Sequence, residues 1–184
     1  MATQYDSLSD VLSRFIAEQH IFFCATAGPD GRVNLSPKGM DSLRVMGPNR
    51  IVWRNLSGSG NETAGHLAQI NRMTLMWCGF EDKPMILRVY GSARTLHPRD
   101  ADFAELNDMF PPSLGARQVY DVRIEMVQTS CGYAVPFMDY AGERDVLTKW
   151  TENKGADGIA KYWESKNQHT IDGAPTHILG EDGT

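Results

Sequence analysis

The sequence has few of the residues that build metal centres and disulfide frameworks. It holds three cysteines, none of them in a C-x-x-C pair, which predicts reduced, mostly buried thiols and neither a zinc site nor a disulfide framework. Its five histidines include no pair four residues apart and no H-E-x-x-H pattern. The sequence therefore predicts no metal site.

Long apolar runs and clusters of positive charge are also missing. No stretch approaches the ~20 apolar residues of a membrane-spanning helix. The N-terminus lacks the basic segment and apolar run of a signal peptide, so we expect a cytoplasmic protein without a membrane partner. Because 18 basic residues stand against 23 acidic ones and no dense Lys/Arg group occurs, the sequence also argues against nucleic-acid binding.

The sequence does contain enough apolar material for a core, and a series of β-prone segments. Its 184 residues, 41% of them hydrophobic, suit one domain with an appendage. Short apolar or alternating runs bounded by turn residues predict strands at 21–27, 32–36, 49–55, 73–80, 85–95 and 119–128. Periodic apolar faces predict helices at 7–19, from 59 to 71, and at 98–109.

Capping patterns set the expected starts of two of these helices. Ser7 with Asp10, and Ser59 with Glu62, have the spacing of a capping box. The apolar face of the first helix is predicted to comprise Leu8, Val11, Leu12, Phe15 and Ile16. The face of the second is predicted to comprise Ala64, Leu67, Ala68 and Ile70.

One polar stretch stands out, and it reads Arg32-Val33-Asn34-Leu35-Ser36-Pro37-Lys38-Gly39. Because side chains alternate along a strand, Val33 and Leu35 share one face, and the polar residues between them share the other. That polar face either meets solvent on an edge strand or meets a cofactor. Pro37 fixes the backbone at the point where Lys38 projects, which favours the cofactor.

A second polar stretch, residues 54–63, leaves a strand through a Gly/Ser loop and opens a helix. Loop amides and the helix dipole at such a point can hold a phosphate. An ordinary loop before a capped helix has the same sequence pattern, so both a phosphate site and a purely structural loop stay open. Glu62 argues against a phosphate site, because a carboxylate in the first turn competes for the same dipole.

After Cys131 the character of the sequence changes. An irregular aromatic stretch is followed by helical patterns at 143–150 and 158–167, and then by a polar segment without periodicity. We expect residues 131–184 to form an extension that packs on the barrel or on a partner, with Trp150, Tyr162 and Trp163 as packing anchors.

With its antiparallel strands, the helix after the third of them and these two polar stretches, the chain resembles the pyridoxamine-5′-phosphate-oxidase-like family of FMN-binding split β-barrels. The motifs that carry the resemblance are Asn-x-Ser-Pro-Lys-Gly from Asn34 and Gly-Asn-Glu-Thr from Gly60, and it extends over residues 8–126. It implies a mainly β fold with flanking helices, a six-stranded antiparallel split β-barrel, over residues 1–130. Residues 131–184 also look like the C-terminal extension of the subgroup with these motifs.

The resemblance also implies a site and a partner. In the family, the strand before the lysine lies along the flavin ring, and here its positions are Val33, Asn34, Leu35, Ser36 and Lys38. The next strand end and helix start hold the phosphate of FMN, and here those positions are Trp53, Arg54, Asn61, Glu62 and Thr63. Family members are homodimers with FMN at the subunit interface, so the same is expected here. Trp77 and Arg88 are candidates for contacts across that interface.

Three functions follow from these observations. The first is an FMN-dependent oxidoreductase of unknown small-molecule substrate, with a nicotinamide as an optional electron donor; no acid or base stands out as catalytic. The second is a non-catalytic flavin module, a sensor or carrier, whose pocket alternatively holds haem or a deazaflavin. Haem requires a ligand, and the nearby His66 is predicted on the exposed face of its helix. The third is an interaction domain without a cofactor.

The C-terminus departs from the oxidase that makes pyridoxal phosphate. That enzyme ends with Arg and His residues that hold its substrate, whereas residues 167–184 here contain no Lys or Arg. Glu181 and Asp182 repel a phosphorylated substrate. FMN binding is therefore predicted, and oxidation of pyridoxamine 5′-phosphate is not.

Overall fold

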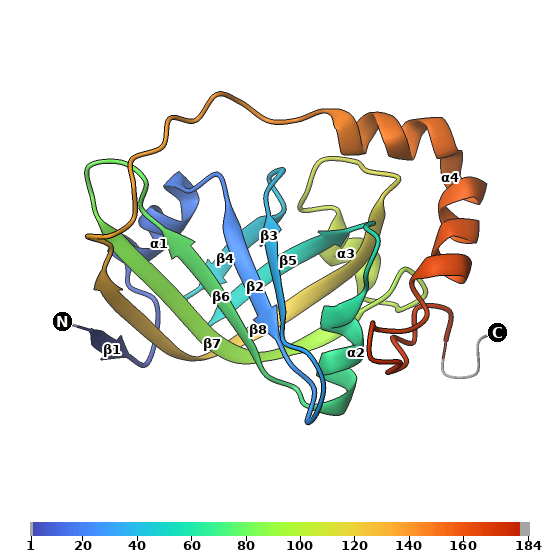
Figure 1. Ribbon diagram of the computed structural model, residues 1–184, viewed down its shortest axis with the longest axis horizontal. Helices are drawn as coiled ribbons and strands as arrows, with labels where there is room; N and C mark the ends of the chain where they lie inside the picture. The colour runs from blue at the N-terminus through green and yellow to red at the C-terminus, as the bar shows by residue number, and fades with distance from the viewer. Residues whose placement is uncertain (1, 181–184) are drawn as a thin grey trace.

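A long antiparallel sheet, curled into a barrel, forms the body of the protein (Figure 1). The computed structural model describes residues 2–180, so Glu181 and Asp182 lie outside the described residues. The described strands are β1 Thr3–Tyr5, β2 Phe22–Thr26, β3 Asn34–Lys38, β4 Leu43–Gly47, β5 Arg50–Leu56, β6 Met73–Cys78, β7 Met85–Leu96 and β8 Ala116–Cys131. They are ordered β3-β2-β6-β7-β8-β5-β4, with β1 added on β8. This is the predicted split-barrel class, with eight described strands in place of six.

The additional strand β4 and the length of β3 have local explanations. β4 follows a turn at Met40 and Asp41, whose φ angles of 62° and 49° are rare for residues with side chains. β3 continues through Pro37 and Lys38, two residues beyond the prediction. Proline is tolerated there because β3 is an edge strand, so one side of its backbone needs no ladder partner.

Large aromatic side chains fill the barrel. Trp53, Trp77 and Tyr120 are each at most 1% exposed. The ring of Phe22 meets that of Trp53 edge-on, with 5.7 Å between the centroids. The alternating residues of β2 and β5 supply this interior, which fixes the register of both strands. A smaller apolar cluster lies between the outer face of β5 and β8 and helix α3, Phe103–Asn107.

The predicted helix starts need correction. Helix α1, Asp10–Glu18, is capped by Ser9, whose side chain accepts a hydrogen bond from the Leu12 amide at 3.3 Å; Ser7 does not cap it. Val11 is 61% exposed and is not part of the buried face. Helix α2, Glu62–Gln69, follows Asn61, and neither Ser59 nor Glu62 forms the expected capping box. Ala68 is also exposed.

Residues beyond β8 cross the molecule and return to α2 (Figure 1). Residues 132–145, which we call the strap, run over the barrel from the end of β8 to α4, Val146–Lys166. Helix α4 is the two predicted helical segments joined across Gly155, where φ is 65°. Residues 167–180, which we call the tail, then pack beside α2. None of the helices within residues 2–180 is long and apolar enough to cross a membrane.

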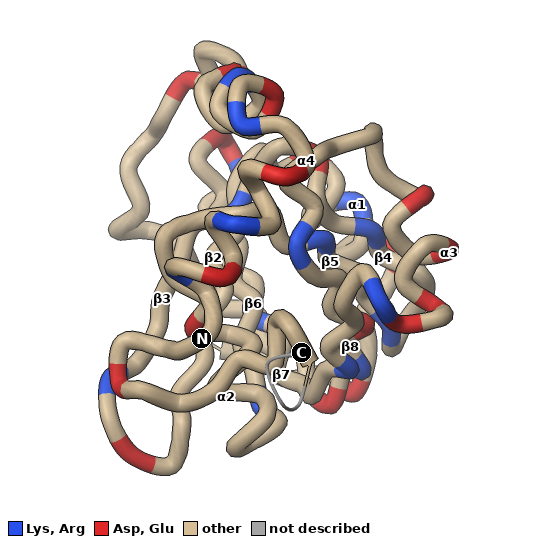
Figure 2. The backbone as a smooth tube through the Cα atoms, turned by 90° about the vertical axis from the view of Figure 1, so that its right-hand side faces the viewer, with Lys and Arg blue, Asp and Glu red and all other residues tan. Residues whose placement is uncertain are grey.

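Charges are dispersed over this framework. Both signs of charge occur along the described chain, and Figure 2 shows no helix or strand that is basic throughout. Several of these charges form exposed pairs, such as Arg50 with Asp121 across β5 and β8 at 2.8 Å. Exposed pairs contribute little to stability, typically about 0–1 kcal/mol.

Candidate functional site

A pocket of about 910 Å³ opens at the split of the barrel, between β3 and β5. These two strands stand near opposite ends of the sheet order, and the curl of the sheet brings them face to face. The ammonium of Lys38 on β3 lies 5.4 Å from the ring centroid of Trp53 on β5. The two polar stretches of the sequence therefore meet in space.

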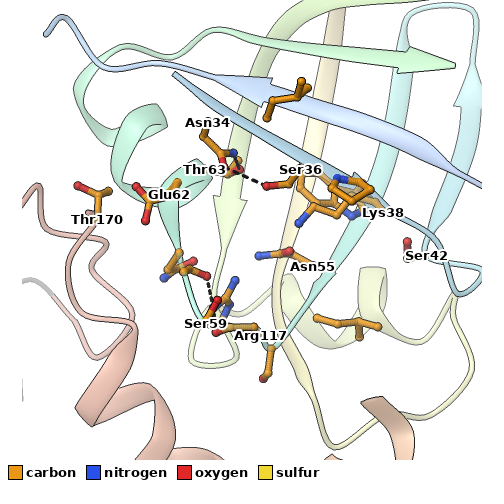
Figure 3. A pocket seen from close by; sticks show the side chains of 18 of the residues that line it. Asn34, Ser36, Lys38, Ser42, Asn55, Ser59, Glu62, Thr63, Arg117 and Thr170 are labelled. Atoms are coloured by element: carbon orange, nitrogen blue, oxygen red, sulfur yellow. Dashed lines mark hydrogen bonds between the residues drawn. The ribbon is translucent and has the colours of Figure 1, made fainter. Parts of the chain in front are cut away.

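All ten residues predicted to bind the cofactor line this single pocket: Val33, Asn34, Leu35, Ser36, Lys38, Trp53, Arg54, Asn61, Glu62 and Thr63. Figure 3 shows that Asn55 and Arg117, which were not predicted, reach the same space from β5 and β8. The pocket is strongly basic for a chain of net charge −5, because five Lys or Arg residues and one acid line it. This balance favours an anionic ligand.

The polar face of β3 turns toward the pocket. Ser36 Oγ donates a hydrogen bond to Asn34 Oδ1 at 2.9 Å, and Asn34 Nδ2 reaches Thr63 Oγ1 on α2 at 3.5 Å. Val33 and Leu35 point the other way and are 73% and 62% exposed. The polar side chains of Asn34 and Ser36 are half-buried at the pocket, whereas the apolar side chains of this stretch face solvent.

Lys38 is a half-buried cation at the edge of the pocket. Burial lowers the pKa of its ammonium, and the positive charge of Arg117 lowers it further. The thiol of Cys24, behind it in the barrel, is uncharged at neutral pH because burial raises its pKa to about 11. Lys38 therefore carries a charge for which the surroundings provide little compensation.

Arg117 is a deeply buried cation of the site and, like Arg54, is 3% exposed. Its Nη1 donates to the carbonyls of Gly58 and Gly60 at 3.3 and 2.9 Å and to Asn167 Oδ1 at 2.8 Å. Burial lowers the pKa of this guanidinium to about 10, so it stays charged at neutral pH. No carboxylate of residues 2–180 forms an ion pair with it. Buried charges are normally paired, which points to an anionic partner in the pocket.

The Gly/Ser loop is held by these same contacts. In a trans peptide the N–H points opposite to the C=O, so the amides of Ser59 and Asn61 face away from Arg117. Helix α2 begins directly after this loop, and its N-cap residue makes no side-chain capping bond. Arg117 thereby fixes the loop, and Gln118 engages the side-chain oxygen of the N-cap residue Asn61, so the N-terminus of α2 is left uncapped as a phosphate site requires.

Glu62, which was expected to compete with a phosphate, has another partner. Both of its carboxylate oxygens accept a hydrogen bond from the Ile171 amide, at 3.1 Å each. Asp172 pairs with Arg32 at the tip of the β2–β3 hairpin. The tail therefore walls one side of the pocket and engages the carboxylate that opposed the phosphate interpretation.

Buried polar atoms without partners lie in the pocket walls. Among the described residues these are Trp53 Nε1, Arg54 Nε and Asn55 Oδ1. Such atoms are costly to bury unpaired, at about 1–3 kcal/mol each. All three belong to β5, whose Trp53, Arg54 and Asn55 side chains are at most 3% exposed, so these atoms lie behind the surface of the pocket.

Arg117 and Asn55 were missed because their surroundings come from distant parts of the chain. Asn55 Nδ2 donates to Gln118 Oε1 at 3.0 Å, and Gln118 Nε2 donates to Asn61 Oδ1 at 3.0 Å. For Asn55 the available signal was its place in the polar stretch 54–63, and for Arg117 it was the Arg117-Gln118 dipeptide at the start of an apolar strand. That signal alone does not separate a site from an exposed strand end.

Two expectations about surrounding residues are wrong. His66 is 3% exposed, and its Nδ1 lies 3.1 Å from Thr26 Oγ1, because the tail and β2 cover the helix face that was expected to be open. Trp77 fills the barrel interior and offers no surface to a second subunit. Arg88 is half-buried and donates to Ser130 Oγ at 3.2 Å within the sheet, and its contact with a second subunit stays a prediction. The histidine that does line the pocket is His169 in the tail.

Comparison with known proteins agrees with this geometry. A family model described as pyridoxamine 5′-phosphate oxidase matches residues 8–131. The chain is 32% identical over 191 residues to the pyridoxamine 5′-phosphate oxidase family protein ustO of Aspergillus flavus. The alignment covers 93% of this chain and 76% of the fungal protein.

Solved structures share the fold at low sequence identity. A candidate pyridoxamine 5′-phosphate oxidase of Lactobacillus delbrueckii has a TM-score of 0.54 and 20% identity, over 67% of this chain and 94% of the other. A HupZ variant of Group A Streptococcus has a TM-score of 0.52 and 14% identity, over 66% and 98%. The family model and the fungal relative together show that this chain belongs to the pyridoxamine 5′-phosphate oxidase family.

Proposed function

We propose that the chain binds FMN in the pocket at the split of the barrel and acts as an FMN-dependent oxidoreductase. The observation that carries the proposal is the buried, unpaired guanidinium of Arg117 beside the open N-terminus of α2. A site of this kind suits one terminal phosphate. Family membership supports a flavin as the group that carries the phosphate.

The described residues divide into two groups around this pocket. Arg117, the loop from Gly58 to Gly60 and Thr63 suit the phosphate, whereas Asn34, Ser36 and Lys38 on β3 suit the polar edge of the ring. FMN bound there supplies the electron-transfer chemistry, and the protein orients it and tunes its charge. The ammonium of Lys38 favours negative charge on the group beside it.

We also propose that two copies associate across this pocket, which puts FMN at the subunit interface. Val33 and Leu35 support the proposal, because they are large apolar residues exposed beside the pocket. They lie on β3, an edge strand of the sheet. Exposed edges with apolar side chains favour pairing with another chain.

The phosphate assignment can be tested with two ligands that differ only in the phosphate. We expect FMN to bind at least about tenfold more tightly than riboflavin, since a charge-assisted contact contributes about 1.5–3 kcal/mol. Arg117→Met should reduce that ratio toward one. Arg123→Met, in an exposed side chain of the same strand, is the matched control and should leave the ratio unchanged.

The outcome decides between the proposal and its alternatives. Equal affinity for both ligands in the wild-type protein refutes the phosphate site. If Arg117→Met keeps the wild-type ratio of FMN to riboflavin affinity, the phosphate does not bind at Arg117. Oxidation of NADH or NADPH by the FMN-loaded protein supports an enzyme, and a flavin that stays oxidised with both supports the non-catalytic module.

Pyridoxamine 5′-phosphate is not the proposed substrate. A second phosphate needs its own cationic site, and the tail supplies none, because residues 167–184 contain no Lys or Arg. Two further arginines that reach the tail are already engaged with it: Arg32 with Asp172, and Arg99 with the carbonyls of His177 and Ile178. Arg117, which contacts Asn167 in the tail, is assigned to the phosphate of FMN.

A further inference from the structure

A second cavity, of about 990 Å³, lies between the strap and the barrel, and we call it the chamber. Figure 1 shows the strap passing over the ends of the barrel strands from β8 to α4. The volume is in the range of small-molecule sites, about 300–1,000 Å³. The chamber is therefore large enough for a molecule of several rings.

The strap is fixed to the barrel by specific contacts. The Met138 amide donates to the Phe80 carbonyl at 3.2 Å. The ring of Tyr140 stacks on that of His20, with 3.6 Å between the centroids and 7° between the planes. Tyr140 Oη also donates to Glu143 Oε1 at 2.9 Å. These contacts hold the roof of the chamber in place without filling the space below it.

The chamber adjoins the proposed FMN pocket. Residues 37–40 and Leu147 line both spaces. Lys38, which we assign to the ring of the flavin, is therefore part of the wall between them. A molecule in the chamber lies next to the ring end of the pocket and away from Arg117, which lines only the pocket.

The two spaces differ in chemistry. The chamber is walled by apolar and aromatic side chains that include Ile21, Phe23, Phe80, Met138, Leu147 and Trp150. Its acidic residues are Glu18, Glu81, Asp139 and Glu143, against the basic residues Lys38 and Arg144. The balance of charge is the reverse of that in the FMN pocket. Anions are disfavoured here, and apolar molecules that are uncharged or positively charged are favoured.

We propose that the chamber binds the substrate of this protein and that the substrate is an apolar, ring-containing small molecule that is uncharged or cationic. The proposal rests on the proposed function, because it gives the flavin site a substrate class. It assigns the phosphate-binding and substrate-binding roles to separate spaces joined at Lys38. It also gives the strap a role as the wall that distinguishes substrates.

The test uses two fluorescent probes that differ by one sulfonate. N-phenyl-1-naphthylamine is neutral, and 8-anilinonaphthalene-1-sulfonate is the same molecule with a negative charge. We expect the FMN-loaded protein to bind the neutral probe at least about tenfold more tightly, because the acidic residues repel the sulfonate. Trp150 lines the chamber, so energy transfer from tryptophan should accompany binding. Equal affinities, or tighter binding of the sulfonate, would overturn the charge assignment.

A pair of variants locates the probe. Val146 lines the chamber at the first position of α4, where an acidic residue is favourable to the helix. Val146→Asp should therefore fold and should weaken binding of the neutral probe about tenfold or more. Val11→Asp introduces the same charge at a residue of similar exposure on α1, outside the chamber, and should change it by less than about twofold. Equal effects of the two variants would show that the probe binds elsewhere.

FMN titrations separate failure of this inference from failure of the proposed function. Tight FMN binding without binding of the neutral probe rejects the chamber as a site and leaves the flavin proposal intact. Loss of the probe on addition of FMN shows that the probe occupied the flavin pocket, which also overturns the inference. Loss of the probe as the protein dimerises would show that a second copy fills the chamber.

Discussion

Replacement of Lys38 by methionine should weaken FMN binding without lowering the stability of the FMN-free protein. Lys38 is half-buried between the pocket and the chamber, with its ammonium over the ring of Trp53 at 5.4 Å. Burial lowers the pKa of this ammonium. The folded protein therefore holds the proton less tightly than the unfolded chain, and at neutral pH the charge reduces the free energy of unfolding.

The magnitudes follow from this placement. Methionine has a similar length and retains an apolar contact with the tryptophan ring, so the free energy of unfolding of the FMN-free variant should be unchanged or higher. Loss of a charge-assisted contact to FMN costs about 1.5–3 kcal/mol, which corresponds to about a tenfold to hundredfold loss of affinity.

The assay compares FMN titrations with urea unfolding of the FMN-free protein. Lys161→Met, in an exposed lysine of α4, is the control and should leave both quantities within about 0.5 kcal/mol of the wild type. Unchanged FMN affinity in Lys38→Met would refute the role of Lys38. A loss of stability comparable to the loss of affinity would make Lys38 a structural residue.

Three further predictions concern the edge strand, the buried histidine His97 and the substrate. Leu35→Asp should convert the proposed homodimer into a monomer, measured by light scattering at micromolar concentration, and a wild-type monomer would contradict the dimer. His97 should destabilise the protein in acid, because burial and then Arg99 lower its pKa from 6.5 to about 4. Its stabilising contribution is present above pH 6.5 and is lost as the pH falls toward 4, which amounts to about 2 kcal/mol between pH 7 and pH 5. In urea unfolding at pH 7 and pH 5, the free energy of unfolding of His97→Gln should therefore fall by about 2 kcal/mol less than that of the wild type. Equal falls in the two proteins would contradict the assignment. Pyridoxamine 5′-phosphate should not be oxidised efficiently, and a kcat/KM of about 10⁴ M⁻¹s⁻¹ or more in an oxygen-coupled assay would show that the reasoning from the tail is wrong.

The parts of the fold and site that the sequence predicted are those specified by local patterns. Alternation predicted the polar face of β3, the proline predicted the position of Lys38, and the Gly/Ser loop predicted the start of α2 to within three residues. All ten predicted residues therefore line one pocket. The split-barrel class also followed from strand patterns together with the family resemblance. Strand β1 was missed because it has only three residues, and β4 because it begins after the unusual turn at Met40 and Asp41.

The parts that failed depend on contacts between distant residues. His66 was placed on an open helix face because nothing in its own segment indicates that the tail covers it. Arg117 was missed because its acceptors come from the loop at 58–60 and from Asn167, 50 residues further on. The pairing of Arg32 with Asp172 joins residues 140 positions apart. Long-range packing of this kind leaves no periodic trace in a single sequence.

The most direct test of the account is the identity of the cofactor in the purified protein. We predict a yellow protein with a flavin absorption spectrum, which releases FMN on denaturation and takes up FMN again after its removal. The pocket supports this result because the guanidinium of Arg117 beside the N-terminus of α2 suits a single terminal phosphate. Release of FAD alone, or no flavin binding after incubation with FMN, would contradict the central claim.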